Sequence, residues 1–117
     1  MILYIFYIDI PSVKASVRPL VAYGDHVVVI NCLVIADPKE TAIIWKKVID
    51  DVPTAFSITS SRKYNGGLVD TPSLTIANVV DSDSGYYICE ATNPVGTGSS
   101  NVVYLDVVGG NCVDRDV

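Results

Sequence analysis

The stretch DSDSGYYIC, from Asp81 to Cys89, holds the densest set of side chains in this chain that could do chemistry: acids, serines, tyrosines and a thiol. A nucleophilic site would need a base beside the serine or cysteine, but the single histidine, His26, lies far upstream. A calcium loop could use Asp81 and Asp83, but its glycine comes one position early and its twelfth position is Thr92 instead of glutamate. The stretch therefore favours a structural role, and we expect neither an enzyme nor a metal site.

The composition favours one globular domain and argues against several classes of partner. Of 117 residues, 50% are hydrophobic and 18% are charged, which supplies enough apolar surface for a single core. The formal net charge is -5, and no basic cluster is longer than Lys46-Lys47 or Arg62-Lys63. Nucleic acid and anionic membranes need a basic footprint, so neither is an expected partner. We also expect no cofactor and no small-molecule substrate.

The two ends of the chain differ from the region between them. The first residues, MILYIFYIDIP, contain an apolar run that is too short to span a bilayer and lacks the positive charge of a secretory signal. We interpret 1–11 as a segment of uncertain role, from a fragment or an uncertain gene start. Residues 110–117 begin at the second of a pair of glycines, continue with an acidic stretch and are typical of a linker or tail. The predicted domain covers 12–109.

Short strands fill this predicted domain. Val, Ile, Thr and Tyr dominate the segments between clusters of Gly, Pro, Asp, Asn and Ser, and no window keeps a helical period. The turn clusters, Asn65 to Gly67 among them, recur at the spacing of an all-β sandwich. The last strand is expected to be the most regular. The predicted strands are 12–15, 17–22, 26–36, 42–49, 54–59, 62–64, 72–79, 85–92 and 98–108.

Alternation along these strands separates a core from two outer faces. We take Cys32 and Trp45 as pointing inward and extend the pattern from them. The predicted core then also contains Val28, Ile30, Val34, Ile43, Leu74, Ile76, Tyr87, Cys89, Ala91, Val103, Leu105 and Val107.

The spacing of four residues is the most specific pattern in the chain. Trp45 follows Cys32 by thirteen positions, Cys89 follows Trp45 by forty-four, and Tyr87 stands two before Cys89. Together with SLTIANV, DSDSGYYICEATNPVG and NVVYLDV, this pattern resembles immunoglobulin domains, in particular the intermediate set of hemicentin-like and titin-like tandem arrays. The resemblance covers residues 12 to 109. It implies an all-β, immunoglobulin-like β-sandwich of two antiparallel sheets with Greek-key topology.

The same resemblance implies roles for the framework residues. Cys32 and Cys89 would form a disulfide across the two sheets, with Trp45 packed against it and Leu74 in the same core. The turn before the second cysteine would form a tyrosine corner.

In that corner Tyr87 would bury its ring and bond its hydroxyl to nearby backbone. Gly85 would permit the tight turn, and Asp83 would pair with a basic residue, for which Arg62 is our prediction. Tyr86 would then face outward.

The outward positions of three strands predict a protein-binding face. Aromatic and aliphatic residues with charged edges are the composition that interfaces favour, although strands often expose such residues without a partner. A second apolar face on the opposite sheet would carry Val27, Val29, Leu33 and Ile35, which the N-terminal run could cover. The candidate interface consists of Ile44, Lys46, Tyr86, Ile88, Glu90, Val102 and Tyr104.

Two further features each have two possible roles in the sequence. The loop Asn93 to Gly98, NPVGTG, resembles the hairpin that contacts neighbouring domains in tandem arrays, but it also fits a plain Gly/Pro turn. Cys112 lies beyond the last strand and is predicted to be an unpaired thiol. It would either form a bond to another domain or chain, or be separated by truncation from a partner further along the chain.

These patterns predict a non-catalytic module that binds other proteins or a second copy of itself, next to neighbouring immunoglobulin-like domains. We expect it to act in cell adhesion or extracellular recognition, at the cell surface or outside the cell, within a larger protein. An immune receptor of an invertebrate type fits equally well. The alternative is a structural spacer of an intracellular titin-like filament protein, in which the cysteines would stay reduced.

Overall fold

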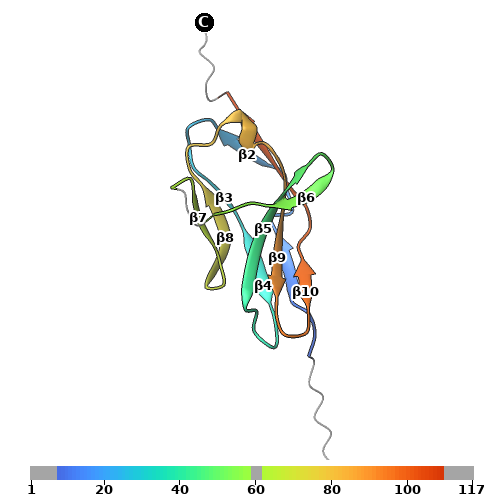
Figure 1. The fold of residues 1–117 in the computed structure, drawn as a ribbon. Helices are drawn as coiled ribbons and strands as arrows, with labels where there is room; N and C mark the ends of the chain where they lie inside the picture. The colour runs from blue at the N-terminus through green and yellow to red at the C-terminus, as the bar shows by residue number, and fades with distance from the viewer. Residues whose placement is uncertain (1–7, 59–61, 110–117) are drawn as a thin grey trace, which may run out of the picture.

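The computed structural model describes residues 8–58 and 62–109, and these fold as two β layers packed face to face (Figure 1). The described chain enters at one end of the sandwich and leaves at the other. No helix of the described residues is long and apolar enough to cross a membrane. The elements are β1 Ser12–Ala15, β2 Leu20–Tyr23, β3 Val28–Ile30, β4 Cys32–Ile35, β5 Ala42–Ile49, β6 Val52–Ala55, β7 Tyr64–Leu68, β8 Thr71–Ile76, η1 Asp81–Asp83, β9 Gly85–Thr92, β10 Thr97–Ser99 and β11 Val103–Val108.

The first layer contains β1, β4, β3, β8 and β7. Strands β3, β8 and β7 pair in that order, and β1 pairs antiparallel with β4. Only Asn31 separates β3 from β4, so the two strands are parts of one run of chain. The Cys32 amide donates to Ser73 Oγ at 2.9 Å, which continues the contact between this run and β8.

The second layer has the strand order β2-β11-β9-β5-β6, and β10 also pairs with β9. All of these pairs are antiparallel except β2 with β11, which is parallel. The first part of the chain therefore changes layer between β1 and β2. This layer carries most of the candidate interface.

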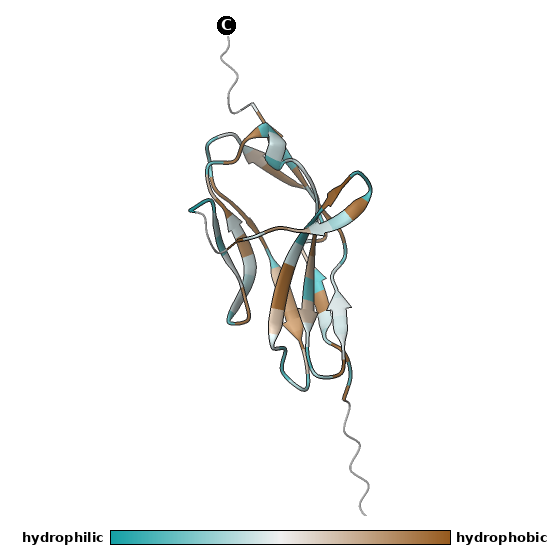
Figure 2. Ribbon diagram, viewed as in Figure 1, coloured by the Kyte–Doolittle hydropathy of each residue, from teal (hydrophilic) through white to brown (hydrophobic). Residues whose placement is uncertain are grey.

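The core lies between the two layers and has the predicted parity. Apolar segments occur in the strands of both layers, while many of the connecting turns are hydrophilic (Figure 2). Val28, Val34 and Ile43 are partly buried against this core. Its fully buried large side chains are Trp45, Tyr87, Ile30, Leu74, Ile76, Leu105, Val79, Val103 and Cys89.

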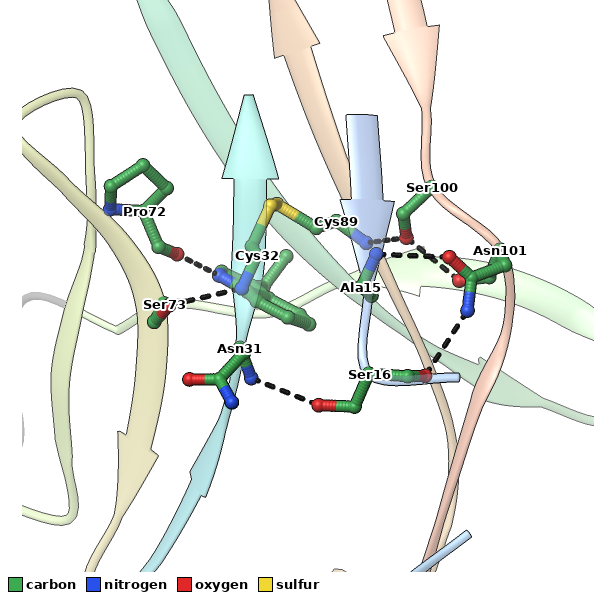
Figure 3. The surroundings of a disulfide bond; sticks show 10 residues. Ala15, Ser16, Asn31, Cys32, Pro72, Ser73, Cys89, Ser100 and Asn101 are labelled. Atoms are coloured by element: carbon green, nitrogen blue, oxygen red, sulfur yellow. Dashed lines mark hydrogen bonds between the residues drawn. A yellow bond between two sulfur atoms is a disulfide. The ribbon is translucent and has the colours of Figure 1, made fainter. Parts of the chain in front are cut away.

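The last predicted strand, 98–108, is not regular. It is interrupted between β10 and β11, where the side chain of Ser100 bonds to the backbone of β9 and that of Asn101 bonds to the backbone at the end of β1 (Figure 3). Ser100 Oγ accepts from the Cys89 amide at 2.9 Å. The side chain of Asn101 accepts from the Ala15 amide at 2.9 Å and donates to Ser16 O at 3.1 Å. The predicted strand 26–36 is interrupted in a similar way at Asn31, whose amide donates to Ser16 Oγ.

The cluster Asn65 to Gly67 was expected to form a turn, and this was wrong. These residues lie within β7, and the register of β7 against β8 shifts between Gly66 and Leu68. Glycine is required at Gly66, because its φ is +79° and a Cβ there would come 2.1 Å from Ser73 O. The predicted strands 54–59 and 62–64 are replaced by β6 and β7.

Candidate protein-binding face

The centre of the sandwich is held by a disulfide between Cys32 and Cys89, whose Cα atoms are 6.5 Å apart. Cys32 begins β4 and Cys89 lies in β9, so the bond joins the two layers (Figure 3). Trp45 packs in the same core, is 1% exposed, and donates from Nε1 to Pro72 O at 2.8 Å. The indole therefore contributes apolar area while its one polar group stays bonded.

The turn before β9 has the geometry of a tyrosine corner. The Tyr87 hydroxyl donates to Asp83 O at 2.6 Å, and its ring meets Phe56 edge-on at 6.1 Å between centroids. Burial, and after it the charges of Asp83 and Tyr64, raises the pKa of Tyr87 well above its usual range. Gly85 has a φ of +147°, and a Cβ there would come 3.0 Å from the Cε of Lys47.

Lys47 belongs to this corner, and sequence reasoning did not find it. It occupies an inward position in the second half of β5, opposite Tyr87 on β9. Its ammonium lies 5.6 Å from the centroid of the Tyr87 ring and donates to Ser82 O. Alternation puts Lys47 on the same side of its strand as Trp45, but it gives no information about the neighbours that Lys47 meets across the turn.

The ion pair of Asp83 is formed with Lys63, and the predicted pairing with Arg62 was wrong. Lys63 Nζ lies 2.7 Å from Asp83 Oδ2, and the carboxylate also accepts from the Val80 amide at 2.8 Å. The Ala77 amide donates to Lys63 O, which places Lys63 beside the end of β8. The neighbouring position, Arg62, is exposed.

Of the two acids of this turn, Asp83 is thus bonded within the framework, whereas Asp81 is exposed. Asp81 and Asp83 lie in η1, and Asp83 is buried with its partners already in place. Within residues 8–58 and 62–109, no group of three or more His, Cys, Asp or Glu side chains could hold a metal ion.

The outward side chains of β5, β9 and β11 gather in rows across the second layer. Tyr104 pairs in register with Tyr86, and their ring centroids are 4.9 Å apart. Val102 precedes β11 and is exposed, as is Ile44 on β5, whereas Ile88 between them is half-buried. The structure therefore brings the predicted apolar side chains onto one surface, which we call the β5/β9/β11 face.

One ion pair lies within this face. Lys46 Nζ is 3.0 Å from Glu90 Oε1, and Glu90 also accepts from Ser99 Oγ at 3.2 Å. Lys46 is opposite Ile88 and Glu90 is opposite Ile44, so the pair runs diagonally among apolar neighbours. The face thus carries a cation and an anion that partly neutralise each other.

The face extends further than the sequence predicted. On β2, Val21 and Tyr23 are 56% and 60% exposed while Ala22 between them is buried, so the two point outward beside β11. On the opposite edge of the layer, β6 continues the face beyond β5, and its Pro53 pairs with Val48 of β5. The alternation in Leu20–Tyr23 was readable, but the parallel pairing with β11 that assigns it to this layer was not.

The outer surface of the first layer is also apolar along one run of chain. Val27, Val29, Leu33 and Ile35 are all exposed, as alternation predicted. We call these four residues the β3/β4 stripe. The N-terminal run that could cover them, residues 1–7, lies outside the described residues.

The loop after β9 packs against the start of its own chain. The side chain of Asn93 donates to Asp9 O at 2.7 Å and to Pro38 O at 3.0 Å, and it accepts from the Val95 and Gly96 amides. Asn93 and Gly96 also exchange backbone hydrogen bonds, which makes the loop a tight hairpin. Contact between this loop and a neighbouring domain stays a prediction, and Cys112 lies outside the described residues.

Comparison with known proteins agrees with this architecture. A family model described as an immunoglobulin domain matches residues 10–93. The chain belongs to the immunoglobulin-domain family. The set within that family to which it belongs stays a prediction.

The chain spans only a small part of two relatives with which it was compared, a titin homolog and a cell adhesion molecule. It is 38% identical over 88 residues to the titin homolog of Caenorhabditis elegans, matching 74% of this chain and a share of the relative that rounds to 0%. It is 31% identical over 78 residues to the cell adhesion molecule Dscam1 of Drosophila melanogaster, matching 67% of this chain and 4% of Dscam1.

A solved structure of the N-terminal Ig1-2 module of the Drosophila receptor protein tyrosine phosphatase DLAR superimposes with a TM-score of 0.70 at 27% identity. The match covers 87% of this chain and 47% of that one. The domain is therefore of the kind found in multidomain adhesion and titin-like proteins.

Proposed function

We propose that this immunoglobulin domain is a non-catalytic protein-binding module of a longer multidomain protein that acts in cell adhesion or extracellular recognition. The observation that carries the proposal is the β5/β9/β11 face, where paired tyrosine rings and exposed aliphatic side chains surround one ion pair. Aromatic residues with few charges around them are enriched at the centre of protein-binding surfaces. The likeness to Dscam1, named a cell adhesion molecule, supports the same function.

The partner that this face fits best is a second copy of the chain. In a two-fold arrangement the same surface meets itself, so each charged group must find its opposite on the same patch. Lys46 and Glu90 satisfy this condition, because each can face the other residue of the second copy. The net charge of -5 repels copies only over about 8 Å at physiological salt, and the face itself contributes little to it.

A structural spacer in a titin-like protein is the second candidate, favoured by the match to the titin homolog. A spacer in a reducing compartment would have to stay folded without the bond between Cys32 and Cys89. The stability of the reduced chain therefore separates the two functions.

The proposal is tested by placing charges on the β5/β9/β11 face. Ile44→Lys combined with Tyr104→Glu changes two exposed positions and leaves the half-buried Ile88 in place. We expect sedimentation equilibrium to show self-association of the wild-type chain and its loss in this variant, with an unchanged melting temperature. Beads coated with the wild-type chain should aggregate, and beads coated with the variant should not.

The matched control carries the same charges on the other layer. Val29→Lys combined with Leu33→Glu alters the β3/β4 stripe and should leave association intact. If only this control loses association, the binding surface is the β3/β4 stripe and the β5/β9/β11 face is ordinary strand surface. If the wild-type chain does not associate at all, a second copy is not the partner, and the spacer function gains support.

A further inference from the structure

Asn65 and Gly66 lie in β7, at the register shift against β8, in a geometry that brings two reactive groups together. The Gly66 amide nitrogen is 2.9 Å from Oδ1 of Asn65, the residue directly before it, and Asn65 is exposed. The Gly66 N–H is therefore directed at the side chain of its own neighbour. Since Gly66 has no Cβ, no side chain hinders the approach of its nitrogen to the Asn65 amide carbon.

We propose that Asn65 is a site of spontaneous covalent modification, in which the side-chain amide is lost through a cyclic imide. The Gly66 nitrogen loses its proton to solvent and attacks Cγ of Asn65, so that a C–N bond forms and the side-chain nitrogen leaves as ammonia. Water then opens the succinimide ring at either carbonyl. The products are aspartate and isoaspartate, and no oxidant, reductant or cofactor is needed.

The other asparagines of the described chain lack this arrangement. The backbone amide that follows Asn31 donates a hydrogen bond to Ser73 Oγ, and the one that follows Asn78 donates to His26 O. Asn93 precedes Pro94, which has no N–H, and its side chain is already bonded in the hairpin. The side chain of Asn101 is held by Ala15 and Ser16, and a β-branched valine follows it. Asn65 therefore differs from these asparagines in two ways: glycine follows it, and the amide of that glycine contacts its side chain.

The modification would change the outer surface of the first layer. Asn65 pairs with Thr75, and Thr75 pairs with Val29 in the next strand, so the three lie in one row. Strands lie about 4.8 Å apart, which puts a new carboxylate at Asn65 roughly 10 Å from the β3/β4 stripe. Isoaspartate would also lengthen the backbone of β7 at the register shift. The chain would gain one negative charge beside an apolar surface.

The test is a time course of the folded chain at neutral pH and physiological temperature, followed by peptide mapping with mass spectrometry. We expect Asn65 to be converted to a mixture of aspartate and isoaspartate while Asn31, Asn78, Asn93 and Asn101 stay intact. A protein isoaspartate methyltransferase should label the aged chain at this position. Asn65→Gln is the matched control, because the longer side chain would have to close a six-membered ring, and this variant should stay unlabelled.

Two comparisons show whether the folded structure permits the reaction. A synthetic peptide with the sequence KYNGGL should deamidate as well, since its asparagine is also followed by glycine. If the peptide reacts and the folded chain does not, the proposal is overturned. In the destabilised variant Tyr87→Phe, Asn65 should deamidate at the wild-type rate. A deamidation rate that rises with the unfolded fraction of this variant would show that the reaction needs unfolding, and this also contradicts the proposal.

Discussion

The two faces of the layer β2-β11-β9-β5-β6 use similar residue types in opposite ways. On β9, Tyr87 is 1% exposed and its hydroxyl is bonded to Asp83 O, whereas the adjacent Tyr86 is 50% exposed and packs its ring against Tyr104. The inner face is fixed by specific bonds, among them the disulfide and the hydrogen bond of the Tyr87 hydroxyl. The outer face keeps apolar side chains in water, although the core is complete without them. Residues of the first kind hold the fold, and we propose that residues of the second kind contact a partner.

The largest effect is expected at the bond across the layers. Replacing both Cys32 and Cys89 with alanine removes a cross-link between residues 57 apart in the chain. The chain-entropy relation gives a loss of about 4 kcal/mol in the free energy of unfolding. Urea unfolding of the double variant and of the wild-type chain measures this loss. An equal stability of the two would favour the titin-like spacer and weaken the distinction between the faces.

The two adjacent tyrosines give the sharpest test of the inner and outer assignment. Tyr87→Phe keeps the ring but removes a buried hydrogen bond, so it should cost roughly 1 to 3 kcal/mol. Tyr86→Phe, its matched control, should cost almost nothing. Thermal melts of both variants measure the difference. If the two melt alike, the parity of β9 is shifted by one residue.

The ion pair of Asp83 allows a similar comparison between neighbours. Lys63→Met leaves a buried carboxylate without its cation and should cost about 1 to 2 kcal/mol, between the values for exposed and buried pairs. Arg62→Met should have little effect, because Arg62 is exposed. Urea unfolding of both variants checks this. A larger cost at Arg62 would restore the pairing that the sequence first suggested.

A smaller effect is expected at high pH. Burial raises the pKa of Tyr87, so above pH of about 10 the unfolded chain loses this proton while the folded chain keeps it. The stabilisation is therefore complete below about pH 10 and is lost as the pH rises further. The free energy of unfolding of the wild-type chain should fall more steeply in this range than that of Tyr87→Phe. Parallel slopes would show that Tyr87 is not buried in the way described.

Much of the inner face could be predicted from the sequence, because it depends on local alternation and on the spacing of Cys32, Trp45 and Cys89. A strand with period two fixes which neighbours share a face, so one inward residue determines the rest. Less of the outer face could be predicted. Val21 and Tyr23 join it through a parallel pairing with β11, a contact between distant parts of the chain that no local pattern encodes.

The errors at shorter range have the same cause. Whether Arg62 or Lys63 pairs with Asp83 depends on the backbone hydrogen bond between Lys63 and Ala77. Whether Gly66 lies in a strand or a turn depends on its close contact with the backbone of Ser73. In both cases the deciding partner lies on β8 or at its end. Alternation within one strand gives no information about that register.

The central claim is that the outer face of this layer is a contact surface while the inner face only holds the fold. Hydroxyl-radical footprinting of the wild-type chain, dilute and at a concentration where it associates, measures this directly. We predict that Tyr86, Tyr104 and Ile44 become protected on association, that Tyr87 is protected under both conditions, and that Leu33 and Ile35 stay reactive. Protection of Leu33 and Ile35 instead, or no change at Tyr86 and Tyr104, would contradict the account.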